Sequence, residues 1–340
     1  MKRTVSNAVI PTLIAVSTAM PAAGDTLENV RSRGVVQCGV APGVPGFSNP
    51  DTAGNWQGLD ADFCRAVATA VLGAPDKVKF IPLSGKERFV AVQSGEVDLL
   101  SRKTTDTVSR EIGQGVDFVG TIFYDGQGFM VPKALGMKAA KDLEGASICT
   151  MTGTTSEQTA TEYFRSHNMS FDLVVFEKED EAVAAYDGGR CDTITFDKST
   201  LAAYRIKLKN PEDHMILPDT ISKEPLAPAV RHGDNRWGDI VSMTLNALIE
   251  AEELDLTAAK IDEQKAEPAN PAIERFLGVG ADFGKDLNLP ADWMGAVIKA
   301  VGNYGEIYDR NVGPNTKLGL ERGINSLWSH GGLHYGNPVR

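Results

Sequence analysis

The segment Ala91–Arg110, AVQSGEVDLLSRKTTDTVSR, contains the pattern from which the fold of this chain can be predicted. It ends a helical stretch, turns at Gly95, passes through a short apolar strand at 97–100 and enters a polar loop at 101–110. Hydroxyl groups and the fixed geometry of guanidinium groups suit a carboxylate, so we expect this loop to bind an anion. A solvated surface loop is the alternative interpretation, because most arginine side chains are exposed.

A second copy of the pattern lies at 185–192, AYDGGRCD. Both copies end a helix, turn at glycine and enter a strand through an apolar residue followed by aspartate. The first loop is cationic, with Arg102, Lys103 and Arg110, whereas the loop after the second strand offers Asp197. A chance likeness between two ordinary α/β turns is the alternative explanation.

The alternation of strands and helices predicts an α/β fold with parallel sheets covered by helices. The first series has strands at 34–40, 77–83 and 97–100 with helices at 62–71 and 86–93. A second series begins after residue 132, with strands at 146–150, 174–176 and 191–195 and helices at 157–166 and 180–186. Further helices are predicted at 237–253, 258–265, 273–277, 293–303 and 319–328.

The composition is that of a globular protein, and the charge excludes one class of partner. The chain has 340 residues, a net charge of -11 and a pI near 5.0. Binding to nucleic acid normally requires a basic face, so we do not expect a nucleic-acid partner.

The N-terminus predicts export. Lys2 and Arg3 precede an apolar run at 8–20 and small residues at 22–24, which is typical of a signal peptide at residues 1–24 cleaved near Asp25. No later stretch approaches the roughly 20 apolar residues that a membrane helix needs. We therefore expect the mature protein to be soluble and exported.

Export makes the four cysteines informative. Cys38 and Cys64 flank the first strand-to-helix unit, and Cys149 and Cys191 lie on two strands of the later unit. We therefore predict the disulfides Cys38–Cys64 and Cys149–Cys191, although three pairings are possible and the sequence alone does not choose among them. A metal site is disfavoured because the sequence has neither a CxxC pair nor a Cys/His spacing typical of one.

The segment 58–63, GLDADF, followed by a helix of small residues, resembles the signature of the family 3 extracellular solute-binding proteins, which serve polar amino-acid ABC importers. Ala61 departs from that signature, where a larger aliphatic residue or threonine is usual. The resemblance continues through Arg110, 153–155 and Asp197. The segment 303–311, NYGEIYDRN, resembles the long subgroup that binds general L-amino acids or glutamate, glutamine, aspartate and asparagine.

The resemblance implies a role for each suspected residue. Arg110 would bind the α-carboxylate of the ligand with Thr105 beside it. Thr155 would donate from lobe 2, at a helix N-terminus whose backbone amides favour an anion. Asp197 would bind the α-ammonium group. Arg102, Lys103, Arg88 and also Lys86 lie near the same edge of lobe 1, where one or two of them would bind a side-chain carboxylate, although Lys86 and Arg88 could equally begin a solvated helix.

The implied architecture is the two-lobed periplasmic-binding-protein fold of type II, with two hinge strands and a helical C-terminal extension. We expect residues 25–129 and 226–340 to form lobe 1 with this extension, and residues 130–225 to form lobe 2. The implied partners are an L-amino acid and an ABC permease in the inner membrane. The protein would be a monomer without a cofactor or metal.

An enzyme on the same scaffold, resembling cyclohexadienyl dehydratases, is the alternative function. The sequence shows no evident nucleophile with a base and no GxSxG or HExxH motif. The histidines are expected on surface or tail segments, and they are His167, His214, His232, His330 and His334.

Overall fold

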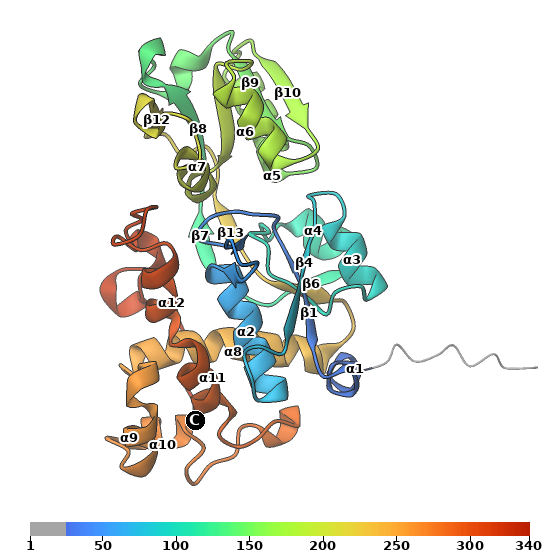
Figure 1. The fold of residues 1–340 in the computed structure, drawn as a ribbon, viewed down its shortest axis with the longest axis vertical. Helices are drawn as coiled ribbons and strands as arrows, with labels where there is room; N and C mark the ends of the chain where they lie inside the picture. The colour runs from blue at the N-terminus through green and yellow to red at the C-terminus, as the bar shows by residue number, and fades with distance from the viewer. Residues whose placement is uncertain (1–24) are drawn as a thin grey trace, which may run out of the picture.

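The computed structural model describes residues 25–340, which form two lobes (Figure 1). The predicted signal peptide, residues 1–24, lies outside the described residues. Each lobe is built on a five-stranded sheet in which three neighbouring strands run parallel, whereas the remaining pairings are antiparallel. The predicted two-lobed α/β fold is therefore confirmed.

Lobe 1 contains the sheet with the order β4-β1-β5-β14-β6. Its strands are β1 (Val36–Val40), β4 (Val78–Pro82), β5 (Leu99–Leu100), β6 (Val116–Phe118) and β14 (Ala229–Arg231), with a small ribbon of β2 (Asn49–Pro50) and β3 (Trp56–Gln57). Its helices are α1 (Thr26–Arg33), α2 (Leu59–Leu72), α3 (Arg88–Ser94) and α4 (Val108–Gly113). Because β14 follows lobe 2 in sequence and pairs with β5 and β6, the chain returns to lobe 1 to complete its sheet.

Lobe 2 contains the sheet with the order β10-β9-β11-β8-β12. Its strands are β8 (Gln127–Pro132), β9 (Ser147–Met151), β10 (Asp172–Phe176), β11 (Thr193–Asp197) and β12 (His214–Ile216). Its helices are α5 (Thr155–Ser166), α6 (Glu179–Asp187) and α7 (Lys198–Arg205), with 3-10 turns η1 (Lys133–Leu135), η2 (Ala140–Leu143) and η3 (Pro211–Asp213). Helix α7 begins directly after Asp197, where the sequence had predicted only a loop.

Two antiparallel strands, β7 (Phe123–Asp125) and β13 (Glu224–Leu226), connect the lobes. The C-terminal part of the chain supports this hinge: the Asn325 side chain accepts a hydrogen bond from the Tyr124 backbone N–H at 2.7 Å and donates one to the Tyr124 carbonyl at 2.9 Å. Asn325 thus bonds to β7 on the edge that does not face β13. The two predicted hinge strands are confirmed.

The C-terminal extension is helical but differs from the prediction in detail. Its elements are α8 (Asn235–Glu253), η4 (Ala258–Lys260), α9 (Ile261–Ala266), α10 (Pro271–Phe276), η5 (Lys285–Leu287), α11 (Trp293–Val301), α12 (Tyr304–Asn311), η6 (Gly323–Asn325) and η7 (Trp328–His330). The helix predicted at 319–328 is wrong, because Gly319 and Gly323 adopt left-handed φ values of 61° and 48° that interrupt a right-handed helix. Within residues 25–340, no helix combines the length and apolar character needed to cross a membrane.

The two signature stretches of the sequence meet at helix α2. Gly58 precedes the helix with φ 123°, and a Cβ atom there would lie 2.2 Å from the Phe47 carbonyl oxygen, so only glycine fits. Asp62 accepts hydrogen bonds from Arg310 at 2.8 Å and from Asn311 at 2.7 Å, which joins α2 to α12.

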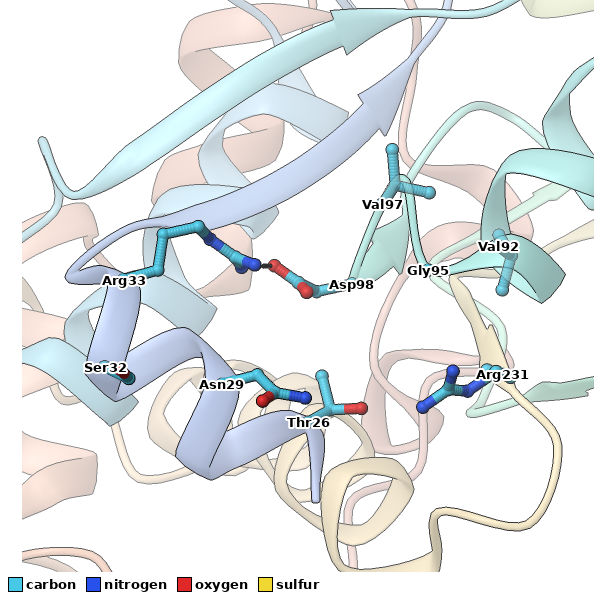
Figure 2. A pocket seen from close by; sticks show the side chains of 9 residues that line it. All are labelled: Thr26, Asn29, Ser32, Arg33, Val92, Gly95, Val97, Asp98 and Arg231. Carbon is cyan, nitrogen blue, oxygen red and sulfur yellow. Dashed lines mark hydrogen bonds and ion pairs between the residues drawn. The ribbon is translucent and has the colours of Figure 1, made fainter. Parts of the chain in front are cut away.

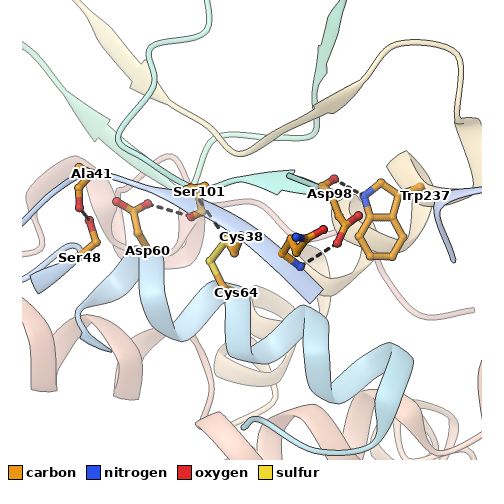
Figure 3. The surroundings of a disulfide bond; sticks show 10 residues. Cys38, Ala41, Ser48, Asp60, Cys64, Asp98, Ser101 and Trp237 are labelled. Carbon is orange, nitrogen blue, oxygen red and sulfur yellow. Dashed lines mark hydrogen bonds between the residues drawn. A yellow bond between two sulfur atoms is a disulfide. The ribbon is translucent and has the colours of Figure 1, made fainter. Parts of the chain in front are cut away.

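Both predicted disulfides are present. Cys38–Cys64 joins β1 to α2 (Figure 3), and Cys149–Cys191 joins β9 to the residues that lead into β11. Figure 3 also shows that Asp60, one turn before Cys64 on α2, accepts a hydrogen bond from the Ser101 hydroxyl at 2.9 Å. The disulfide and this hydrogen bond together fix α2 against the start of the 101–110 loop.

Candidate ligand-binding site

A cavity between the lobes lies where the strands β5 and β11 end. Its volume is about 30 Å³, so the side chains of the two lobes approach closely around it. The residues of lobe 1 that line it are Arg88, Arg102, Lys103, Thr105 and Arg110, and those of lobe 2 include Thr155, Glu179, Asp197 and Thr200. Apart from Lys86, all the residues that the sequence singled out for ligand binding therefore line one cavity. Their individual roles stay a prediction.

Residues 101–110 bring three cations to this cavity, each less than a tenth exposed. Arg102 and Lys103 lie in the loop, but Arg110 lies on α4, which begins at Val108 within the stretch that the sequence predicted to be a loop. Arg102 donates from Nε to the Leu83 carbonyl at 2.9 Å, and Arg110 donates to the Thr105 carbonyl at 2.8 Å. Lys103 adopts a left-handed φ of 45° and donates from Nζ to the Thr200 hydroxyl at 2.6 Å, across the cleft. A lysine in this backbone conformation costs free energy, which is typical of residues positioned for a function.

Arg88 is the most weakly hydrogen-bonded of the four cations that line this cavity. It is 2% exposed, and its Nε has no hydrogen-bond partner among residues 25–340. Its guanidinium lies 4.9 Å from the centre of the Phe89 ring, and Nη2 is 3.5 Å from the Gly153 carbonyl of lobe 2. Burial, with Arg102 and Arg110 nearby, holds the pKa of Arg88 well below its ordinary value. The second interpretation of Arg88, as a solvated residue at a helix start, is wrong, whereas Lys86 is exposed and forms an ion pair with Glu177 of lobe 2 at 2.9 Å.

Asp197 ends β11 and faces the cavity from lobe 2. It is 8% exposed, and its Oδ1 has no hydrogen-bond partner within the described part of the chain. Burial raises the pKa of Asp197 well above its ordinary value, and the neighbouring Asp125 and Glu224 raise it further. A cation placed at Asp197 would favour the charged carboxylate and relieve this unfavourable burial.

Glu224 on the hinge strand β13 was not predicted to take part in the site. Its Oε2 accepts hydrogen bonds from Thr105 at 2.7 Å and from Thr155 at 3.0 Å, so one carboxylate joins a hydroxyl of each lobe to the hinge. The two hydroxyls are 3.4 Å apart. The sequence offered no signal for this role, because Glu224 lies more than a hundred residues from Thr105 and only the fold brings them together.

Glu179, at the start of α6, is a second acid that sequence reasoning missed. It is 7% exposed and lies 3.4 Å from the Arg102 guanidinium of lobe 1, and it accepts a short hydrogen bond from the Tyr204 hydroxyl. Burial alone would raise its pKa, but the charges of Lys103 and Arg102, the hydrogen bond from Tyr204 and the charge of Arg88 together hold the pKa of Glu179 below its ordinary value. Glu179 is therefore a charged partner for the cations of lobe 1.

A wider groove of about 1070 Å³ adjoins the cavity and opens to solvent. Thr105, Arg110, Thr154 and Thr155 line both spaces. Further out, the groove is bordered by Lys86 of lobe 1 and by Gln158, Glu162 and Arg165 of lobe 2. Cationic, anionic and neutral polar side chains thus surround the entrance of the groove.

A separate pocket of about 300 Å³ lies within lobe 1, near the amino ends of β1 and β5 (Figure 2). Arg33 and Asp98 form an ion pair there, and Asp98 also accepts a hydrogen bond from the Gln37 backbone N–H at 2.7 Å. The ligand crevice of an open α/β sheet lies at the opposite, carboxyl ends of the strands. This pocket is therefore not the candidate site.

His334 corrects the expectation that the tail histidines are exposed. It is 1% exposed, and its ring centre lies 4.3 Å from that of Tyr304 and 5.3 Å from that of Tyr124 on the hinge. Burial lowers the pKa of His334 to about 3. The residue is a neutral packing element next to the hinge. Among residues 25–340, no group of His, Cys, Asp and Glu side chains is arranged to hold a metal ion.

Comparison with known proteins identifies a family model and relatives that match this chain. The family model for bacterial extracellular solute-binding proteins, family 3, matches residues 36–261. The general L-amino acid-binding periplasmic protein AapJ of Rhizobium johnstonii is 52% identical over the full length of both chains. The glutamate/glutamine/aspartate/asparagine-binding protein BztA of Rhodobacter capsulatus is 47% identical, covering 96% of this chain and 97% of BztA.

A solved structure extends the likeness to three dimensions. The ABC transporter periplasmic binding protein from Brucella ovis, with glutathione bound, is 52% identical. It superposes with a TM-score of 0.91 and covers 93% of this chain and 99% of its own. The agreement includes both lobes and most of the C-terminal extension.

Proposed function

Because the chain belongs to the family 3 bacterial extracellular solute-binding proteins, we propose that it binds acidic L-amino acids and their amides, with broad specificity, for an ABC importer. AapJ and BztA are named as amino-acid-binding proteins and not as enzymes, and the name of AapJ places it in the periplasm. The protein is thus a substrate-binding component of amino-acid transport. The dehydratase-like alternative has no support from these relatives.

The observation that carries this proposal is that Arg110 of lobe 1 and Asp197 of lobe 2 line the same cavity. An amino acid is a zwitterion, and it would present a carboxylate to Arg110, with Thr105 and Thr155 beside it, and an ammonium group to Asp197. Both charges of the ligand would then be paired away from water, where charge-assisted hydrogen bonds are strongest.

For the ligand side chain, we assign Arg88 as the main partner, with Arg102 and Lys103 contributing charge. Arg102 and Lys103 already have partners in Glu179 and Thr200, whereas Nε of Arg88 has no hydrogen-bond partner within residues 25–340. A terminal amide oxygen or carboxylate would satisfy that donor. This assignment fits both the acids and the amides that the name of BztA includes.

Closure of the lobes about β7 and β13 would couple binding to transport. Direct contacts cross the cleft, including Lys103 with Thr200 and Lys207 with the Gly43 carbonyl at 2.7 Å. Closing the cleft also buries Asp197 and Arg88, which costs free energy unless a ligand pairs with them. The zwitterion therefore favours the closed state, which an ABC permease would recognise.

The remaining expectations belong to the same proposal. We propose that the protein acts as a monomer in the periplasm after cleavage near Asp25. We also propose the lobe limits 25–129 with 226–340 and 130–225. Size-exclusion chromatography with light scattering and N-terminal sequencing of the exported protein test the first two points.

A γ-glutamyl peptide is a second candidate ligand. The relative from Brucella ovis holds glutathione, and in this chain the wide groove shares Arg110, Thr105 and Thr155 with the inner cavity. Glutathione carries the same free α-carboxylate and α-ammonium groups as glutamate, so it would use the same anchors.

A thermal-shift screen against the twenty amino acids and glutathione tests the proposed function. A ligand that binds only the folded protein stabilises it by about 4 kcal/mol at 1,000 times its Kd. We expect the largest increases in Tm with glutamate, glutamine, aspartate and asparagine. An unchanged Tm with all four would contradict the proposal.

A further inference from the structure

Glu179 lies among the cations that lobe 1 brings to the cavity. It comes from lobe 2, is 7% exposed, and is 3.4 Å from the Arg102 guanidinium. The Tyr204 hydroxyl, 3% exposed, donates to its second oxygen. The side chain is therefore fixed from both sides, and it is not free to leave the cavity when the lobes are closed.

The charges of the cavity show why this position matters. Lobe 1 contributes the cations Arg88, Arg102, Lys103 and Arg110. The acids near them are Glu179 and Asp197 in the cavity and Glu224 in the adjoining groove. Asp197 is assigned to the ligand ammonium group, and Glu224 is bonded to Thr105 and Thr155. Glu179 is then the acid that lies against the cations assigned to the ligand side chain.

We propose that Glu179 determines specificity: it is an internal counter-ion that lets the site accept uncharged amide side chains alongside acidic ones. The inference rests on the proposed function, because it concerns which amino acids that same site accepts. Buried cations need a paired anion. If only the ligand could provide it, glutamate would bind well and glutamine poorly. Because Glu179 provides one anion from the protein itself, glutamine leaves fewer cations unpaired.

The same carboxylate also limits the preference for acidic ligands. A ligand carboxylate placed beside Arg88 and Arg102 would share the cavity with the like charge of Glu179, which opposes it. An amide would not meet this repulsion, and its N–H₂ group could donate to the carboxylate. Both effects bring the affinities for glutamate and glutamine closer together.

The test is isothermal titration of the purified protein with L-glutamate and L-glutamine. The quantity compared is the ratio of the Kd for glutamine to the Kd for glutamate. For Glu179→Gln, we expect this ratio to rise at least about tenfold, which corresponds to about 1.4 kcal/mol. The matched control is Glu177→Gln, two residues away: Glu177 also pairs across the cleft, with Lys86, but its side chain is 77% exposed. The control should change the ratio by less than about twofold.

The outcomes separate the two proposals. If the unaltered protein binds neither amino acid, the proposed function fails. If it binds at least one of them and Glu179→Gln leaves the ratio unchanged or lowers it, the role of Glu179 is wrong and the proposed function stands.

A second variant covers the case in which Glu179→Gln does not fold. Arg102→Gln removes a cation that Glu179 neutralises, so it should lower the ratio. The double variant Arg102→Gln/Glu179→Gln removes both charges and should have a ratio above that of Arg102→Gln. Equal ratios in these two proteins would overturn the inference even without the single Glu179 variant.

Discussion

The change Asp197→Asn separates ligand binding from folding in this protein. The carboxyl group is 8% exposed, its Oδ1 has no partner within residues 25–340, and burial raises its pKa well above the ordinary value. The free protein therefore gains nothing from the charge, whereas the proposed complex uses it to pair with the ligand ammonium group. Removing one partner of a buried charge pair costs about 3–5 kcal/mol. Part of that is offset because the variant no longer has to ionise a buried carboxyl group, so we expect a loss of about 3 kcal/mol in binding, or a Kd about a hundred times higher.

The stability of the free protein should change in the opposite direction. The pKa of Asp197 is higher in the folded protein than in the unfolded chain. As the pH rises above the unfolded pKa, the unfolded chain loses this proton first, so the free energy of unfolding decreases until the folded pKa is passed. At neutral pH, Asp197→Asn removes this cost, and the ligand-free Tm should stay level or increase. Titration calorimetry with L-glutamine and a thermal scan without ligand measure the two effects. The control is Asp180→Asn, an exposed aspartate on α6, which should leave both values unchanged. An Asp197→Asn protein that binds within threefold of the unaltered one would refute the reasoning.

Three further predictions concern the fold around the site. Asp62→Ala removes the hydrogen-bond acceptor of Arg310 and Asn311, and we expect it to lower the free energy of unfolding by about 2–4 kcal/mol in urea titrations. The control Asp76→Ala, at an exposed turn, should have little effect. Burial lowers the pKa of His334 to about 3, whereas the pKa in the unfolded chain is about 6.5. As the pH falls below about 6.5, the unfolded chain binds a proton that the folded protein does not, so the free energy of unfolding decreases. We expect His334→Phe to reduce the loss of unfolding free energy between about pH 7 and about pH 4 by roughly 3 kcal/mol, and an equal loss in both proteins would contradict this. Replacing Cys149 and Cys191 by alanine removes a disulfide with a sequence separation of 42 and should lower the free energy of unfolding by about 3–4 kcal/mol. Urea titrations with and without reductant measure this loss. If reductant destabilises this variant as much as the unaltered protein, the disulfide Cys38–Cys64 is responsible for the effect instead.

The features of the fold and the site that could be predicted from the sequence are those that depend on local residue patterns. Asp197 ends β11, and Arg110 lies ten residues after β5, so both belong to the carboxyl end of a strand, where an open α/β sheet binds its ligand. The pairing of the cysteines followed from the same strand and helix assignments, and the structure contains both predicted disulfides. The helix at 62–71 was recognisable from its apolar spacing.

The parts that could not be predicted depend on contacts between distant segments. Glu179 and Glu224 look like ordinary surface acids in the sequence. Only lobe closure brings Glu179 to the cations of the cavity, and only the return of the chain through β13 brings Glu224 to the adjoining groove. His334 lies in a stretch rich in glycine that looks exposed, but its ring packs on Tyr304 and Tyr124. The helix predicted at 319–328 failed because two glycines there adopt left-handed backbone angles, which residue composition does not reveal.

The central claim is that a guanidinium group of one lobe and a carboxylate of the other hold the two charges of an α-amino acid. Titration calorimetry of the unaltered protein with L-glutamate, glutarate and 4-aminobutyrate tests it without any mutation. Glutarate lacks the α-ammonium group and 4-aminobutyrate lacks the α-carboxylate. We expect measurable heat with L-glutamate and a Kd at least about a hundred times higher for each analogue, since each leaves one buried charge unpaired. Equal affinity for L-glutamate and either analogue would contradict it.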